Sequence, residues 1–219
     1  MSVRLTQWPL PKCWVLDANI LFSPWCRVWV QTLAHHAGAT LAWTSVIEEE
    51  CYRNLVRLGR LHADDAQAER LSLASRCSAQ VLPPERVEPY KADVRAVDDK
   101  DRHVAAAALS LKHARAEPVA LLTWNIRDFP KRPLAKLGVL RFSPDELPGE
   151  LGLEGSLLMQ LLDRSAKNLQ AELLAYPHAN PTNYQAQARP LPHSSEEWAA
   201  FLQRNRLHLT AKRAGICIL

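Results

Sequence analysis

The chain has 219 residues, of which 47% are hydrophobic and 23% are charged, and its formal net charge is +4. This balance is ordinary for a soluble globular protein, and the mild basic excess permits an anionic partner without requiring one. The five cysteines form no CxxC pair, which disfavours zinc and thioredoxin-like sites. No apolar run approaches the roughly 18 residues of a membrane span, so we expect a cytoplasmic protein with no membrane partner.

Short apolar runs alternate with helical stretches through the first two thirds of the chain. In chain order, the pattern predicts a strand at 13–17, a helix at 23–38, a strand at 39–43, and helices at 45–58, 64–77 and 87–94. Ser23 and Gly38 are residue types that begin and end a helix. Ser45 and Glu48 have the spacing of a capping box.

The alternation continues to about residue 149. An Ala-rich helix is predicted at 99–116, strands at 118–123 and 139–142, and a short capped turn at 143–147. Strands that are separated by helices predict an α/β fold whose parallel sheet is covered on both faces.

The alternation of predicted strands and helices ends near residue 150, and only helices are predicted after it. We therefore predict a domain over 1–149 and a helical extension over 150–219. The extension contains an amphipathic helix at 157–176, a Pro, Asn and Gln-rich connector at 176–195 that we expect to be extended or poorly ordered, and a capped helix at 194–207.

Acidic residues gather where a parallel sheet would bring element ends together. Asp17 ends the first strand, and Asp128 lies in the loop after the strand at 118–123. Further acids begin the Ala-rich helix or lie in the helix after the second strand: Asp98, Asp99, Asp101, Glu48, Glu49 and Glu50. Ligand sites of parallel α/β sheets lie at the carboxyl ends of the strands. Each acid also has a simpler interpretation as a helix cap, a turn residue or a solvated surface charge.

Converging carboxylates repel one another unless a cation lies between them. Oxygen-only ligands suit Mg²⁺ or Mn²⁺, which orient a water molecule, lower its pKa and stabilise displacement at phosphorus. No Ser–His–Asp or Cys–His arrangement stands out, and the chain has no phosphate-binding glycine loop. The residues therefore favour metal-assisted phosphodiester hydrolysis.

Four segments resemble the motifs of PIN-domain ribonucleases, in the same order and with suitable spacing. They are LDANILFSP, WTSVIEEECYRNL, DDKDRHVAAAAL and LLTWNIRDFP, and the resemblance covers roughly residues 13 to 147. The last two segments resemble the bacterial branch that includes VapC-like toxins. The resemblance implies a sheet of four or five parallel strands and Mg²⁺- or Mn²⁺-dependent cleavage of RNA. It also implies a cognate antitoxin that places a basic residue into the acidic pocket, and it admits a homodimer.

The resemblance also implies roles for particular residues. The metal-binding and catalytic acids would be Asp17, Glu50, Asp101 and Asp128. Supporting positions would be Asp98, Asn125 and Asn19.

Basic residues flank these acids and could engage RNA phosphates. They are Lys100, Arg102, Arg127, Lys131 and Arg132, and each could equally be an ordinary surface charge. Lys100 could instead pair with one of the acids beside it. His103 is expected on the flank of its helix and is left out of the site, and Trp124 is expected to pack in the core rather than stack on a base.

Two other functions compete with the nuclease. The first is a non-catalytic PIN-like module that binds RNA or a protein partner. The second is a phosphoryl-accepting receiver-like domain, which would need an acid pair at the end of the first strand, whereas this chain has one Asp there.

Overall fold

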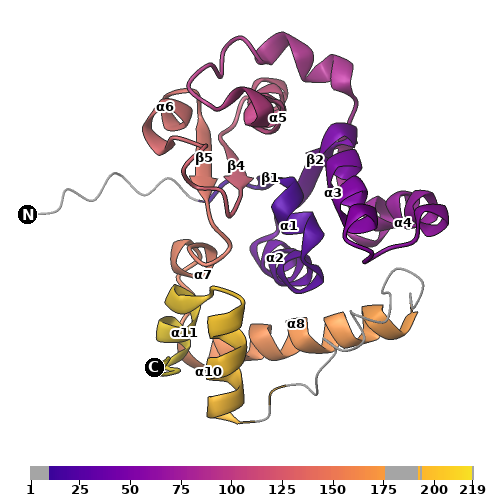
Figure 1. The fold of residues 1–219 in the computed structure, drawn as a ribbon. Helices are drawn as coiled ribbons and strands as arrows, with labels where there is room; N and C mark the ends of the chain where they lie inside the picture. Colours follow the sequence, from indigo (N-terminus) through magenta and orange to yellow (C-terminus); the bar gives the residue numbers. More distant parts are fainter. Residues whose placement is uncertain (1–9, 176–191, 193, 219) are drawn as a thin grey trace, which may run out of the picture.

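The structure is a computed structural model that describes residues 10–175, 192 and 194–218. Five parallel strands form one sheet in the order β3-β2-β1-β4-β5 (Figure 1). They are β1 (Cys13–Leu16), β2 (Thr40–Thr44), β3 (Gln80–Leu82), β4 (Val119–Leu122) and β5 (Val139–Phe142). The predicted α/β fold with a parallel sheet of four to five strands is therefore confirmed. The sequence did not locate β3, because only one of its three residues is buried and it has no apolar run.

Helices cover both faces of this sheet and continue into the C-terminal part. The α-helices are α1 (Ala18–Phe22), α2 (Pro24–Ala37), α3 (Ser45–Arg57), α4 (Ala63–Arg76), α5 (Arg102–Arg115), α6 (Lys131–Lys136), α7 (Leu147–Glu150), α8 (Gly155–Ala175), α10 (Ser195–Arg204) and α11 (His208–Ala214). Three single 3₁₀ turns lie between β3 and α5, namely η1 (Pro84–Arg86), η2 (Glu88–Tyr90) and η3 (Asp99–Asp101). The predicted connector at 176–195 lies almost wholly outside the described residues.

Two local predictions are wrong. The stretch 87–94 forms the 3₁₀ turn η2 and further turns instead of a helix, because its backbone N–H groups bond carbonyls three residues back. Helix α3 is capped by Thr44, whose hydroxyl accepts from the Ile47 N–H at 3.1 Å, and not by Ser45. The predicted ends of α2 are confirmed, since Ser23 caps it and Gly38 follows it with a φ of 62°.

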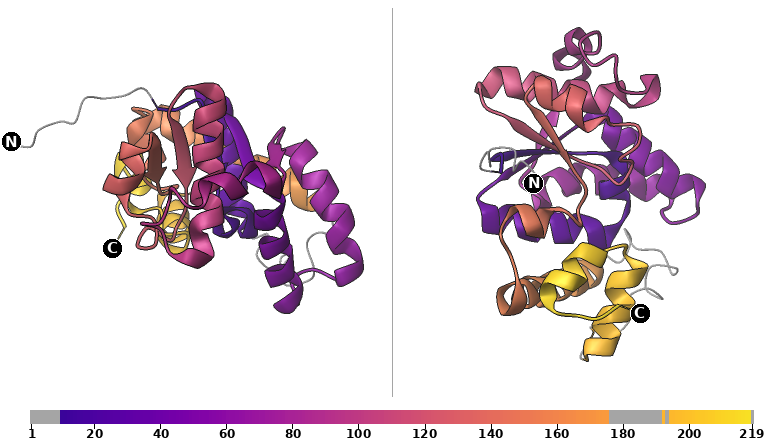
Figure 2. Two further views of the ribbon diagram at one scale, coloured as in Figure 1. Left: turned by 90° about the horizontal axis from the view of Figure 1, so that it is seen from above. Right: turned by 90° about the vertical axis from the view of Figure 1, so that its left-hand side faces the viewer.

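The molecule is layered. Helix α5 crosses one face of the sheet, α2 covers the other, and α8 packs on the outer side of α2 (Figure 1; Figure 2, right). Helices α10 and α11 pack beside α7 and α8 (Figure 1). Buried apolar residues of the sheet and of the C-terminal helices belong to one cluster, so the extension shares the core of the preceding part. In the described part of the chain, no helix has both the length and the apolar character to cross a membrane.

Two polar links fasten the extension to the sheet-containing part. Arg27 of α2 forms an ion pair with Glu172 of α8, and both side chains are largely buried. Asp145, which follows β5, accepts hydrogen bonds from the Leu209 and Thr210 N–H groups at 2.9 and 2.8 Å, and from the Thr210 hydroxyl at 2.9 Å. These bonds satisfy donors at the start of α11 that the helix itself cannot pair.

The register of the sheet places the ends of its central strands side by side. Leu16 of β1 lies opposite Leu122 of β4, and the next N–H along β1, that of Asp17, donates to the Leu122 carbonyl at 3.0 Å. Thr123 continues β4 in the same way, and its N–H donates to the Phe142 carbonyl at 3.1 Å. Asp17 and Thr123 therefore leave the core together, at the carboxyl edge of the sheet.

Candidate functional site

Asp17 lies at the base of the candidate site and is 6% exposed. Its Oδ1 accepts from the Ala18 N–H at 2.7 Å and so caps α1. Its Oδ2 accepts from Asn19 Nδ2 at 2.6 Å and from the Thr123 hydroxyl at 2.7 Å. Three donors thus hold the carboxylate in one orientation, although none of them is a cation.

Thr123 connects this carboxylate to the loop after β4. Its fully buried hydroxyl also accepts from the Asn125 N–H at 2.9 Å and from Asn19 Nδ2 at 3.1 Å. The other side of the Asn19 amide accepts from the Trp124 N–H at 3.1 Å. Thr123 was not among the predicted site residues. The signal was a hydroxyl directly after a buried strand, but its role depends on the register with β1.

Asn125 connects the two outer acids. Its Nδ2 lies 2.7 Å from Asp128 Oδ2 and 3.3 Å from Asp101 Oδ2. Lys100 approaches the same oxygens, with Nζ at 3.1 Å from Asp128 and 4.0 Å from Asp101. Lys100 was expected to pair with an acid beside it in the sequence; it lies within 4.0 Å of Asp101, but its closer partner is Asp128. Phe129 is fully buried and anchors this loop in the core.

The three consecutive glutamates of α3 have different surroundings. Glu48 is buried away from the site and accepts from Trp43 Nε1 at 2.6 Å and from Arg70 Nε at 3.0 Å. Glu49 is exposed. Glu50 extends towards α5, where its Oε2 lies 3.7 Å from His103 Nε2. Of the three, Glu50 is the one beside the other acids.

His103 was expected on the flank of its helix and was left out of the predicted site, but its ring lies beside Glu50. Its side chain is 12% exposed and faces Glu50. Nδ1 lies 2.9 Å from the Lys100 carbonyl oxygen. Nε2 is buried and has no hydrogen-bond partner within the described residues. The sequence pattern could not reveal this, because the inward position of the ring depends on how α3 and α5 pack.

The four acids Asp17, Glu50, Asp101 and Asp128, which we call the carboxylate cluster, influence one another electrostatically. Burial raises the pKa of Asp17, and the negative charge of Glu50 raises it further against the bonds from Thr123 and Ala18. Burial and the charge of Asp17 raise the pKa of Asp101 to about 6. The cluster therefore gathers more negative charge than its surroundings stabilise.

Asp128 behaves in the opposite way. The hydrogen bond from Asn125, and then that from Lys100, lower its pKa. The outer rim of the cluster thus already has an internal cation, Lys100, which lies closer to Asp128 at 3.1 Å than to Asp101 at 4.0 Å.

The donors of the cluster are of the type that divalent cations use. Carboxylate and amide oxygens suit Mg²⁺ and Mn²⁺, and the buried Nε2 of His103 adds a nitrogen without a partner in the described residues. Within residues 10–175, 192 and 194–218, no three His, Cys, Asp or Glu side chains are arranged to hold a metal ion. The residue types fit a cation, and the side chains as placed do not form a finished coordination shell.

The remaining predicted positions lie around the rim. Asp98 is exposed and accepts from the Lys100 N–H at 3.3 Å, so it caps η3. Arg102 binds Asp99 at 2.6 Å, and Lys131 lies 5.9 Å from the centroid of the Phe142 ring. Arg127 and Arg132 are exposed. Trp124 is partly buried against the core, as expected, and its Nε1 donates to the Cys26 sulfur at 3.3 Å.

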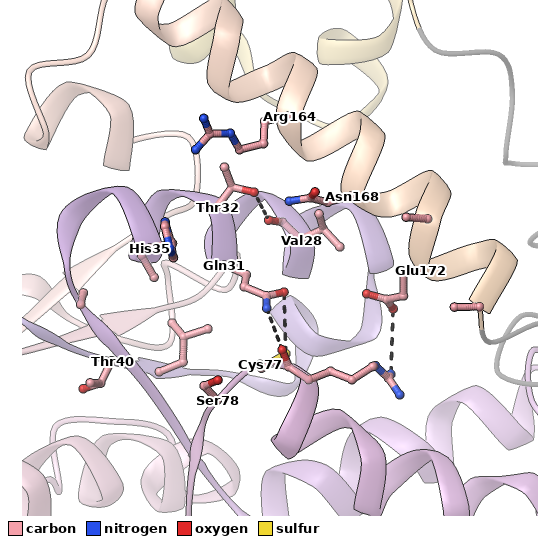
Figure 3. Close-up of a pocket in the computed structure, with 16 residues that line it drawn as sticks. Val28, Gln31, Thr32, His35, Thr40, Cys77, Ser78, Arg164, Asn168 and Glu172 are labelled. Atoms are coloured by element: carbon pink, nitrogen blue, oxygen red, sulfur yellow. Dashed lines mark hydrogen bonds and ion pairs between the residues drawn. The ribbon is translucent and has the colours of Figure 1, made fainter.

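A separate hollow of about 650 Å³ lies between α2, α8 and the end of α4 (Figure 3). Gln31 spans part of it and donates from Nε2 to the Arg76 carbonyl at 3.0 Å. The hollow reaches Thr40 and Leu41 at the start of β2, so it opens near the amino edge of the sheet. It does not include the carboxylate cluster.

No protein-family model matches the chain, and neither a curated protein nor a solved structure matches it.

Proposed function

We propose that the chain is a divalent-metal-dependent endoribonuclease that hydrolyses RNA phosphodiester bonds at the carboxylate cluster. The observation that carries the proposal is the buried Asp17 beside Glu50 and Asp101, where burial and mutual repulsion raise the pKa values of Asp17 and Asp101. Perturbed acids at the carboxyl edge of a parallel sheet are typical of functional sites. The four segments that resemble PIN-domain ribonucleases support the same conclusion.

The cation would be Mg²⁺ or Mn²⁺, held by Asp17, Glu50, Asp101 and Asp128. At such a site a divalent cation activates water and offsets charge on the reacting phosphate. The protein's own contribution is orientation. Thr123 and Asn19 hold the Asp17 carboxylate, and the Asn125 amide holds Asp101 and Asp128 together.

Recognition of RNA would use the rim of the cluster. Arg127 and Arg132 are exposed next to the loop that carries Asp128, and cations at such positions bind phosphates without reading sequence. Lys100 could serve in the same way once Asp128 binds a cation. These contacts would align the backbone of the RNA over the buried carboxylates.

The resemblance to VapC-like toxins suggests that the nuclease is the toxin of a toxin–antitoxin pair. Its partner would be a cognate antitoxin that inserts a basic side chain into the cluster. Lys100 already approaches Asp128 at 3.1 Å, which illustrates how an ammonium group fits this rim. A homodimer is a further assembly that we propose from the resemblance alone.

The alternative is a non-catalytic module that binds RNA or a protein. The observation in its favour is the same Lys100–Asp128 pair, because an internal cation at the rim reduces the need for a metal.

A cleavage assay separates the two functions. Labelled RNA is incubated with Mg²⁺ or Mn²⁺ and the wild type, Asp17→Asn, or the control Asp163→Asn, which changes an exposed acid on α8. The nuclease proposal expects cleavage by the wild type and the control, and a loss of at least about a hundredfold in Asp17→Asn. If all three are inert and all three still bind RNA, the binding module is the better description.

A further inference from the structure

Resting on the proposed function and going beyond it, we propose that His103 is a nitrogen ligand of the cation at the carboxylate cluster. The nitrogen makes this site prefer Mn²⁺ to Mg²⁺. The resemblance to PIN-domain ribonucleases implies only acids as metal ligands, and it gives His103 no role.

The first argument is the tautomer of the ring. A carbonyl oxygen can only accept a hydrogen bond, so the 2.9 Å contact between Nδ1 and the Lys100 carbonyl places a proton on Nδ1. In the neutral ring, Nε2 then carries a lone pair. Metal-binding histidines commonly have this arrangement, in which the second ring nitrogen donates to a backbone carbonyl and fixes the orientation of the ring.

The second argument is where that lone pair lies. Nε2 is buried and lacks a hydrogen-bond partner among the described residues. Its distance to Glu50 Oε2 is 3.7 Å, which is too long for a hydrogen bond. Two atoms that ligate one ion at about 2.0–2.2 Å lie about 3–4 Å apart, so this separation suits a shared cation.

The third argument is the direction in which the ring faces. His103 is near enough to Asp17 to act on it electrostatically, in the opposite sense to Glu50, so the ring borders the buried side of the cluster. The Lys100 side chain instead extends to Asp128 at the more exposed rim. The nitrogen therefore lies on the side of Glu50 and Asp17, and not beside the ion pair of Lys100 and Asp128.

The metal preference follows from the chemistry of the donor. Mg²⁺ binds hard oxygen ligands and retains water, whereas first-row transition ions accept imidazole nitrogen. A neutral nitrogen that replaces one oxygen position gives more affinity for Mn²⁺ than for Mg²⁺.

The competing interpretation is a protonated His103 that forms an ion pair with Glu50. In that case the ring repels a cation, and removal of His103 would leave Mn²⁺ binding unchanged or make it tighter.

Pulsed electron paramagnetic resonance of Mn²⁺ bound to the full chain tests the ligand directly. We expect a ¹⁴N coupling in the wild type that disappears in His103→Gln. The control is His113→Gln on the same helix, whose ring stacks on Tyr90 with a centroid distance of 5.3 Å, and it should keep the coupling. Calorimetric titration should show the Mn²⁺ dissociation constant rising at least about tenfold in His103→Gln, and that of Mg²⁺ changing less than about threefold.

The wild-type spectrum can overturn the proposal even if His103→Gln does not fold. Bound Mn²⁺ without nitrogen coupling, or no Mn²⁺ binding at all, overturns the proposal. Its failure is distinguishable from failure of the nuclease proposal. Absence of nitrogen coupling with RNA cleavage that depends on Asp17 removes only the role of His103. A nitrogen coupling without RNA cleavage removes only the nuclease.

Discussion

Replacing Thr123 with Val should destabilise the protein more than replacing it with Ser. Valine preserves the shape of the fully buried side chain but removes a hydroxyl that bonds Asp17 at 2.7 Å, the Asn125 N–H at 2.9 Å and Asn19 at 3.1 Å. A bond to a charged group contributes about 1.5–3 kcal/mol and a neutral bond about 0.5–1.5 kcal/mol. Since the three bonds share one oxygen and are not additive, we expect a loss of about 3 kcal/mol.

Serine retains the hydroxyl and removes one methyl group, which should cost about 1 kcal/mol. Urea unfolding measures both values, and a thermal melt of Thr123→Val should shift down by about 6–12 °C for a chain of this size. Removing the hydroxyl should also raise the pKa of Asp17 further, because the bond from Thr123 stabilises the ionised form. If Val and Ser variants are equally stable, the hydroxyl is not the link between β1 and the loop after β4.

Asp145→Ala should lower the free energy of unfolding in urea by about 2–3 kcal/mol, because three donors at the start of α11, two of them on Thr210, lose their acceptor; an unchanged value would contradict this. The metal-free protein should lose stability as the pH rises from about 4 towards about 6. The pKa of Asp101 is raised in the folded state, so in this pH range the folded protein binds a proton that the unfolded chain releases. Asp101→Asn should flatten that part of the profile, and an unaltered slope would refute the assignment. NMR titration should show the pKa of Asp101 falling in Asp17→Asn and rising in Lys100→Met, since Asp17 repels its charge and Lys100 attracts it; a shift in the other direction would show that these charges do not act on it.

Asp17 and Asp128 could be located from the sequence because they follow buried strands, whereas Glu50 was selected from the resemblance to PIN-domain ribonucleases. Asp17 directly follows a run of buried residues, and a polar group there has to leave the core at the edge of the sheet. Asn125 and Asp128 follow β4 for the same reason. For these residues the position along the chain was enough, since a parallel sheet brings its carboxyl ends to one edge.

Thr123 and His103 could not be assigned to the site from the sequence, because their roles depend on partners from other helices and strands. The hydroxyl of Thr123 becomes a support only when Asp17 is its neighbour in the register of β1 and β4. The inward position of His103 depends on how α5 packs against α3, which carries Glu50. Glu48 illustrates the same limit, because its partners Trp43 and Arg70 come from β2 and α4 and not from its own helix.

The stacking of α8 on α2 has a consequence for how the protein can be divided. A chain that stopped near residue 150 would uncover Val28 and Thr32, both now buried, and would leave Arg27 without Glu172. An inward guanidinium that loses its counter-charge is strongly unfavourable, so the shortened protein should unfold or aggregate. The C-terminal helices therefore form part of the core that covers α2. A binding partner could not reach the face of α2 that α8 occupies.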